Sequence, residues 1–75
     1  MASSHDPGRP ELVRLHSEWQ ARLTRLRVHE QLLSDALLLL ARGEGPRPDA
    51  IIDEVVQMRA ECSAAFNRLM DAAKA

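Results

Sequence analysis

The stretch that decides the fold lies at residues 40–48 and reads Leu40-Ala41-Arg42-Gly43-Glu44-Gly45-Pro46-Arg47-Pro48. Gly43 is suited to the left-handed conformation that caps a helix C-terminus, and the prolines after it prevent that helix from continuing. Pro48 is suited to the first position of a second helix. Because a linker this short usually joins antiparallel neighbours, we expect a helical hairpin with its turn at residues 43–47.

Helix-forming sequence extends on both sides of this turn. Residues 11–42 contain no Gly or Pro and consist mostly of Leu, Arg, Glu, Gln and Ala, all of which favour helices. Residues 1–9 are rich in Ser, Asp, Pro and Gly, which predicts a flexible N-terminal arm. We therefore predict an all-α protein of two long antiparallel helices, at residues 10–42 and 48–74, packed as in a coiled coil.

Apolar residues recur every three or four positions in both predicted helices, which is the spacing of one helix face. Folding the hairpin about Gly45 places residues at equal distances from the turn opposite one another. The predicted partners are Leu37 with Ile52, Leu33 with Val56, Leu23 with Phe66, and Trp19 with Leu69 or Met70. These contacts would form the seam, the line along which the two helices pack.

The same folding places Glu30 opposite Arg59, where each interrupts the apolar row of its own helix. A polar layer of this kind fixes the register of two helices in some coiled coils, usually at some expense in stability. The alternative is that both side chains lie at the edge of the seam and reach water. The sequence leaves these two roles open.

The apolar faces of both predicted helices are broader than one partner helix can cover. The residues expected to remain uncovered form a predicted interaction face of Trp19, Leu32, Leu39, Ile51, Val55, Met58 and Met70. Trp19 suits two roles, a core residue of the leucine seam or a partly exposed binding anchor. We expect association, either as a homodimer that forms a four-helix bundle or as a complex with another helical protein.

The chain has 75 residues and a single cysteine, so it is one domain without an internal disulfide. A hairpin offers little interior for a catalytic pocket, and His16 and His29 lie about 20 Å apart along one helix, too far to share a metal ion. We therefore expect no enzymatic activity, cofactor, metal or small-molecule substrate. The predicted function is a protein–protein interaction module, that is, an adaptor, a co-chaperone or a regulator.

Charged residues nearly balance, with ten Lys and Arg against eleven Asp and Glu. The formal net charge of −1 argues against nucleic acid as the default partner. Arg14, Arg22 and Arg25 are nevertheless candidate contacts for an anion, and a dimeric nucleic-acid-binding regulator is the alternative function. Otherwise these arginines belong to a solvated helix face.

No apolar segment approaches the roughly 20 residues that a membrane span requires, and residues 1–10 contain no apolar run typical of a signal peptide. We therefore expect a cytoplasmic protein that does not bind membranes. Nine of the ten basic residues are Arg, and together with the many Ala and Leu residues this indicates a GC-rich, bacterial genome.

The turn resembles that of one known group of proteins. Leu40-Ala41-Arg42-Gly43 is followed shortly by Pro46, and it joins two helices in a short chain. In these respects the chain is similar to the small co-chaperones that hold type III secretion needle subunits in the cytosol, and the match covers mainly the turn. The resemblance implies, as a further alternative function, a co-chaperone-like hairpin of a secretion apparatus.

Overall fold

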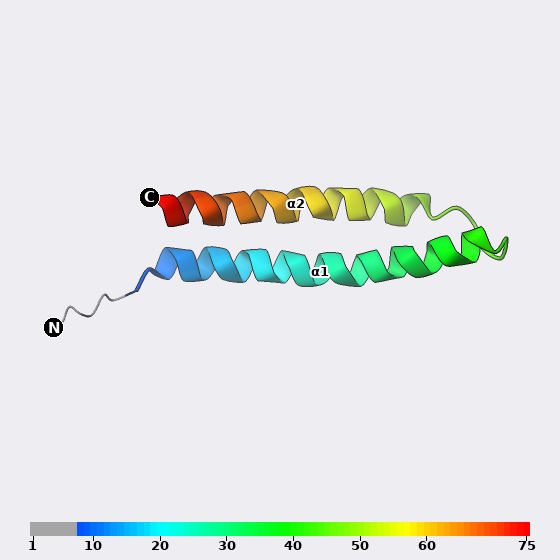
Figure 1. Ribbon diagram of the computed structural model, residues 1–75, viewed down its shortest axis with the longest axis horizontal. Coiled ribbons are helices and arrows are strands. Elements are labelled where there is room, and N and C mark those ends of the chain that lie inside the picture. The colour runs from blue at the N-terminus through cyan, green and yellow to red at the C-terminus, as the bar shows by residue number, and fades with distance from the viewer. Residues whose placement is uncertain (1–7) are drawn as a thin grey trace.

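Two antiparallel helices make up the fold. The computed structural model describes residues 8–75, so most of the predicted N-terminal arm, residues 1–7, lies outside the described part. Helix α1 spans Pro10–Ala41 and helix α2 spans Asp49–Lys74. They lie side by side in an elongated hairpin that measures 66 × 17 × 13 Å (Figure 1). The predicted all-α hairpin is confirmed.

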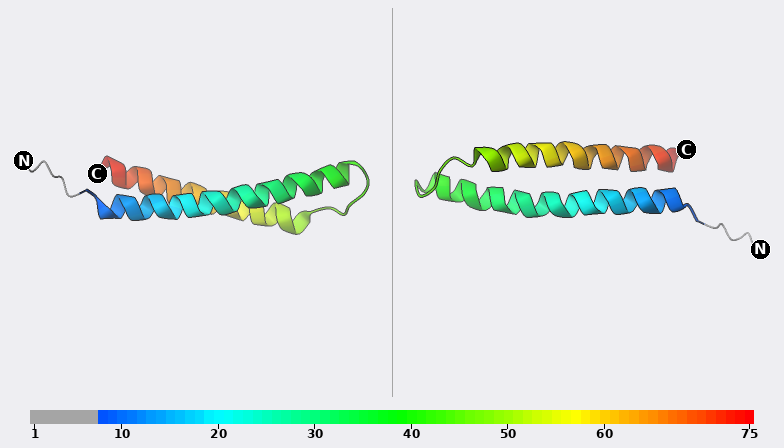
Figure 2. Two further views of the ribbon diagram at one scale, coloured as in Figure 1. Left: turned by 90° about the horizontal axis from the view of Figure 1, so that it is seen from below. Right: turned by 180° about the vertical axis from the view of Figure 1, so that it is seen from behind.

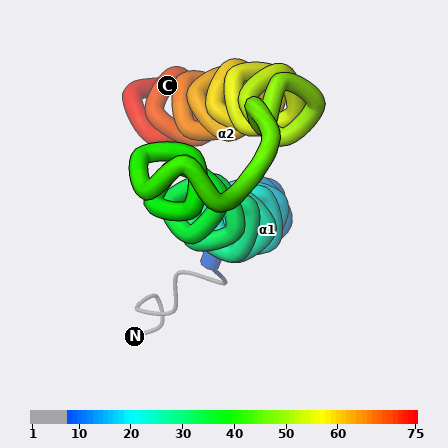
Figure 3. Tube along the Cα trace, turned by 90° about the vertical axis from the view of Figure 1, so that its right-hand side faces the viewer, coloured from blue at the N-terminus to red at the C-terminus, as the bar shows by residue number. Residues whose placement is uncertain are grey.

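The hairpin is a single layer of two helices. Viewed along the helix axes, one helix lies on the other, and among residues 8–75 no third element covers either side of the pair (Figure 3). α1 has 32 residues and α2 has 26, and α1 extends past the beginning of α2 at the turn end (Figure 2). Neither described helix is long and apolar enough to cross a membrane.

The C-terminus of α1 is closed by a Schellman cap, in which two amides beyond the helix return to carbonyls of its last turn. The Gly43 amide donates to the Leu40 carbonyl at 2.9 Å, and the Glu44 amide donates to the Leu39 carbonyl at 2.8 Å. Gly43 has the positive φ, 74°, that this cap requires. The predicted capping role of Gly43 is confirmed.

Replacing Gly43 with Ala is expected to lower the free energy of unfolding by about 1 kcal/mol, because a Cβ disfavours the left-handed backbone. No atom lies within 4 Å of the position that this Cβ would take, so the loss comes from the backbone and not from a clash. The melting temperature should fall by about 4–8 °C. Thermal melting followed by circular dichroism tests this, with Glu44→Ala as control. An equal loss in both variants would contradict the capping role.

The seam is built from small and branched side chains. Its buried members are Leu15 and Leu26 of α1 and Val55, Cys62, Ala65 and Leu69 of α2. Val55, Cys62 and Leu69 are seven residues apart, so they form one row that faces α1 along most of α2. Leu33 packs against the core cluster, which we define as Leu26, Val55 and Cys62.

The rotation of α2 differs from the predicted one. Val56, predicted to face Leu33, is 62% exposed, while its neighbour Val55 is 1% exposed. Phe66, also predicted to lie in the seam, is 40% exposed. One residue corresponds to about 100° of rotation, so the predicted row of α2 lies at the edge of the seam. The prediction was wrong because it paired residues by their distance from the turn, which sets their level along the seam but not the rotation of α2.

Candidate interaction surface

One side of the hairpin carries apolar side chains along both helices. On α1 the row is Leu23, Glu30 and Leu37, and on α2 it is Ile52, Arg59 and Phe66, with a spacing of seven residues in each. Residues seven apart lie on one face of a helix, and the contact between Glu30 and Arg59 shows that the two rows adjoin. We call this side the apolar flank and define it by Leu23, Leu37, Ile52, Val56, Phe66 and Met70 around the Glu30–Arg59 pair.

The apolar flank exposes three of its side chains strongly. Val56 is 62% exposed, Leu37 43% and Phe66 40%. Phe66 contacts Trp19, and their ring centroids are 5.3 Å apart. Trp19 is itself half-buried and packs against the core cluster, with His16 meeting it edge-on. Trp19 therefore packs in the seam, which is the first of its two predicted roles, and its ring also contacts Phe66 on the apolar flank.

The Glu30–Arg59 pair lies in the middle of the apolar flank. Nε of Arg59 donates to Oε2 of Glu30 at 2.8 Å, and Nη2 lies 2.8 Å from the same oxygen. The Arg59 side chain is 62% exposed and that of Glu30 36%, so the pair lies at the edge of the seam and not within it. The predicted contact is confirmed, whereas a role in fixing the register stays a prediction. An ion pair this exposed contributes at most about 1 kcal/mol to folding.

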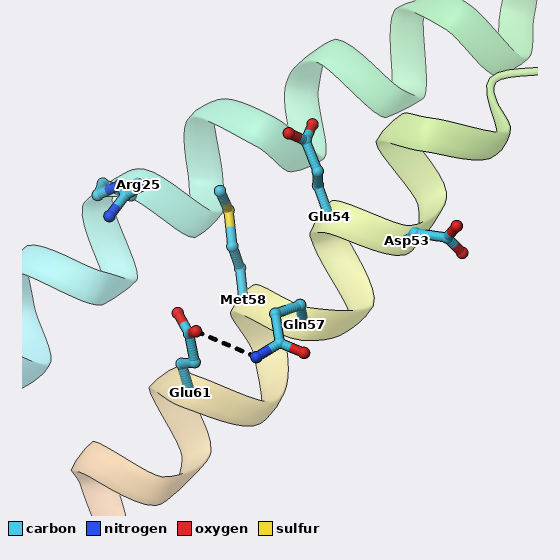
Figure 4. A pocket seen from close by; sticks show the side chains of 6 residues that line it. All are labelled: Arg25, Asp53, Glu54, Gln57, Met58 and Glu61. Carbon is cyan, nitrogen blue, oxygen red and sulfur yellow. Dashed lines mark hydrogen bonds between the residues drawn. The ribbon is translucent and has the colours of Figure 1, made fainter.

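The opposite side of the hairpin is charged. Arg25 of α1 and Asp53, Glu54, Gln57, Met58 and Glu61 of α2 line an open hollow there (Figure 4). Glu54 and Met58 extend from α2 toward α1, and Gln57 donates from Nε2 to Glu61 Oε2 at 3.1 Å. Three carboxylates surround this hollow, so α2 presents a charged surface on this side.

The predicted interaction face is divided between different parts of the molecule. Val55 is buried in the seam, so its assignment to an exposed face was wrong. Ile51 and Met58 are half-buried and pack against the core cluster. The reason is again the rotation of α2, because the row through Ile51, Val55 and Met58 is the one that packs on α1.

The remaining predicted face residues lie on different sides. Leu32 and Leu39 are 50% and 44% exposed, and they follow Arg25 of the charged hollow by seven and fourteen residues, so they lie on the α1 part of the charged side. Met70 is half-buried and follows Phe66 by four residues, which places it on the apolar flank. Of the residues in the predicted face, only Met70 therefore lies on the apolar flank.

The three arginines proposed as anion contacts have acidic neighbours. Arg14 forms an ion pair with Glu18 at 2.7 Å and lies 4.0 Å from Glu11. Arg22 donates to the backbone carbonyl of Glu18 at 3.5 Å and lines a small hollow with Glu61, and Arg25 shares the charged hollow with carboxylates of α2. These acids lower the positive potential that an anion would experience. Binding of an anion by the arginines stays a prediction.

Metal ligands are not clustered in the described part of the chain. Among residues 8–75 no group of three or more His, Cys, Asp and Glu side chains lies close enough together to hold a metal ion. Cys62 is a free thiol buried in the seam, with 7% of its surface exposed. It therefore contributes to packing between the helices.

The predicted interaction face omitted five flank residues, namely Leu23, Leu37, Ile52, Val56 and Phe66. The sequence does contain a signal for those on α2. Arg59 stands midway between Ile52 and Phe66, and a charged residue within an apolar row indicates the edge of a seam more often than its centre.

Comparison of the chain with models of known protein families, with curated proteins and with solved structures finds no match.

Proposed function

We propose that this chain is a non-catalytic interaction module that binds another helical surface through the apolar flank, as an adaptor, a co-chaperone or a regulator does. One observation carries the proposal, namely the asymmetry of the hairpin. The apolar flank exposes Val56, Leu37 and Phe66, whereas the opposite side exposes Asp53, Glu54 and Glu61. The opposite side also exposes Leu32 and Leu39 of α1, but its α2 half carries carboxylates, so the apolar flank is the side on which both helices expose apolar side chains.

Covering the apolar flank is favourable. Complete burial of a Val, Leu or Phe side chain is worth about 1.5–3 kcal/mol. Because Val56, Leu37 and Phe66 are between 40% and 62% exposed, removing their remaining exposure supplies roughly 2–4 kcal/mol. Rows of side chains spaced by seven residues on two adjoining helices also suit packing against another helix, whose side-chain ridges fit between such rows.

Replacing Val56 with Gln is expected to weaken partner binding by about tenfold or more, which corresponds to about 1.4 kcal/mol. Val28→Gln is the matched control, because Val28 is 55% exposed on the outer face of α1 and Gln favours a helix at both positions. Capture of partners by the tagged full chain from its native cells, quantified by mass spectrometry, measures the effect. Retention of every partner by Val56→Gln, or an equal loss with Val28→Gln, would contradict the proposal.

A further inference from the structure

We infer that the partner on the apolar flank is a second copy of this chain, related by a twofold axis parallel to the helices. In this arrangement both turns lie at the same end of a four-helix bundle. The inference rests on the proposed function of the apolar flank as an interaction surface, and it adds the identity and the orientation of the partner. It is carried by two features of the flank, its dimensions and the position of its single ion pair.

The dimensions of the flank match a second hairpin. The hairpin is 17 Å wide, and α2, at 1.5 Å per residue, is about 39 Å long. The surface to be covered therefore projects to roughly 660 Å², close to the roughly 800 Å² that each partner buries in a standard interface. A single helix, about 10 Å across, leaves part of this width open. A second copy has the same width and the same length of apolar surface.

The ion pair selects the orientation. A twofold axis parallel to the helices keeps every residue at its level along the bundle and places α1 of one copy over α2 of the other. Glu30 of each copy then meets the partner's Arg59, and the four charges alternate around a closed ring. A twofold axis perpendicular to the helices and centred on this level would place Glu30 over Glu30 and Arg59 over Arg59. That juxtaposition of like charges opposes binding.

The ion pair also has atoms available for this ring. Nε and Nη2 of Arg59 both contact Oε2 of Glu30, and among residues 8–75 neither Glu30 Oε1 nor Arg59 Nη1 makes a hydrogen bond. In the bundle, Oε1 of one copy accepts from Nη1 of the other. The apolar side chains then supply the affinity, while the ring selects one orientation, as polar residues do in coiled coils.

Two charge reversals test the ring. Glu30→Arg leaves two guanidinium groups on the flank, and Arg59→Glu leaves two carboxylates, so each variant alone is expected to dimerise at least about tenfold more weakly than the unaltered chain. An equimolar mixture should recover the dimer, because opposite charges then meet. Sedimentation equilibrium gives the association constants, and circular dichroism checks that each variant is helical. The ring would be overturned if the single variants dimerised as strongly as the unaltered chain, or if the association constant of the mixture were no higher than those of the single variants.

The orientation is tested without altering the flank. A spin label at Glu44→Cys, in a chain with Cys62→Ala so that only one thiol reacts, marks each turn. Turns at the same end should lie roughly 20–35 Å apart, because neighbouring helices in a bundle are about 8–10 Å apart. Turns at opposite ends of a dimer centred on the Glu30–Arg59 level should lie about 40–50 Å apart, because Glu44 is 14 residues, or about 21 Å, beyond Glu30. Pulsed electron paramagnetic resonance measures the distance, and a value of about 40 Å or more would overturn the orientation.

A strictly monomeric chain at high micromolar concentration would overturn the second copy as partner. The proposed function is tested separately, since Val56→Gln would still reduce capture of a different helical protein if such a protein covers the flank. Loss of that capture together with a monomeric chain would identify a heterologous partner. If the chain does not self-associate and Val56→Gln does not reduce the capture of any partner, the proposed function is contradicted as well.

Discussion

Replacing Val55 with Asp is expected to unfold the hairpin. Val55 is 1% exposed and packs with Leu26 and Cys62 in the core cluster. The change removes about 1.5–3 kcal/mol of apolar burial and places a carboxylate where it loses contact with water, which costs several kcal/mol more. A core this small supplies only about 3–5 kcal/mol of stability. The helical signal in far-ultraviolet circular dichroism should therefore disappear.

Val56→Asp is the matched control, because it makes the same chemical change one residue away. Val56 is 62% exposed, and Val and Asp have similar helix propensities, so at protein concentrations where the chain is monomeric the free energy of unfolding should change by less than about 1 kcal/mol. If the Val56 variant unfolded and the Val55 variant stayed helical, α2 would have the rotation predicted from apolar spacing. The apolar flank would then be assigned to the wrong side chains.

The thiol of Cys62 is expected to react with a bulky aromatic disulfide about 100- to 1,000-fold more slowly in the folded chain than in urea. Cys62 is 7% exposed within the seam, so the reagent reaches its sulfur only when the hairpin opens. The ratio of the two rates then reports the opening equilibrium, and this range corresponds to about 3–4 kcal/mol. Absorbance of the released aromatic thiol measures the reaction.

Ala64 provides the control for this measurement. Ala64 is exposed, lies two residues after Cys62 and is outside the seven-residue row of Val56 and Met70 on the apolar flank, so the variant with Cys62→Ala and Ala64→Cys should react in the folded chain nearly as fast as in urea. Equal rates for the two folded proteins would show that the seam does not protect Cys62. Because association stabilises the folded state, the protection of Cys62 should also increase with protein concentration if copies of the chain bind one another.

The turn and the level at which residues meet could be predicted from the sequence, because both depend on chemistry close to the turn. Gly43 is the residue that the left-handed cap requires, and the prolines beyond it stop the helix. Once the turn is placed, every residue has a partner at the same distance from it. The contact of Glu30 with Arg59 follows from that count.

The rotation of α2 could not be predicted in the same way. Val55 and Val56 are both apolar, and each continues a row with a spacing of three and four, so periodicity favours neither. Packing decides between them, because the seam accepts a small side chain at Ala65 and leaves the larger Phe66 at its edge. The predicted interaction face failed for the same reason, since whichever row enters the seam leaves the other row outside.

The single layer of helices has a consequence for the turnover of the chain. A partner that binds only the folded form adds about 2.7 kcal/mol of stability when its concentration is a hundred times its dissociation constant. For a core worth about 3–5 kcal/mol, this addition is more than half of the original stability. Proteases act on the unfolded fraction. The uncovered hairpin is therefore the form that is degraded first, and the abundance of the chain is expected to follow the supply of whatever covers its apolar flank.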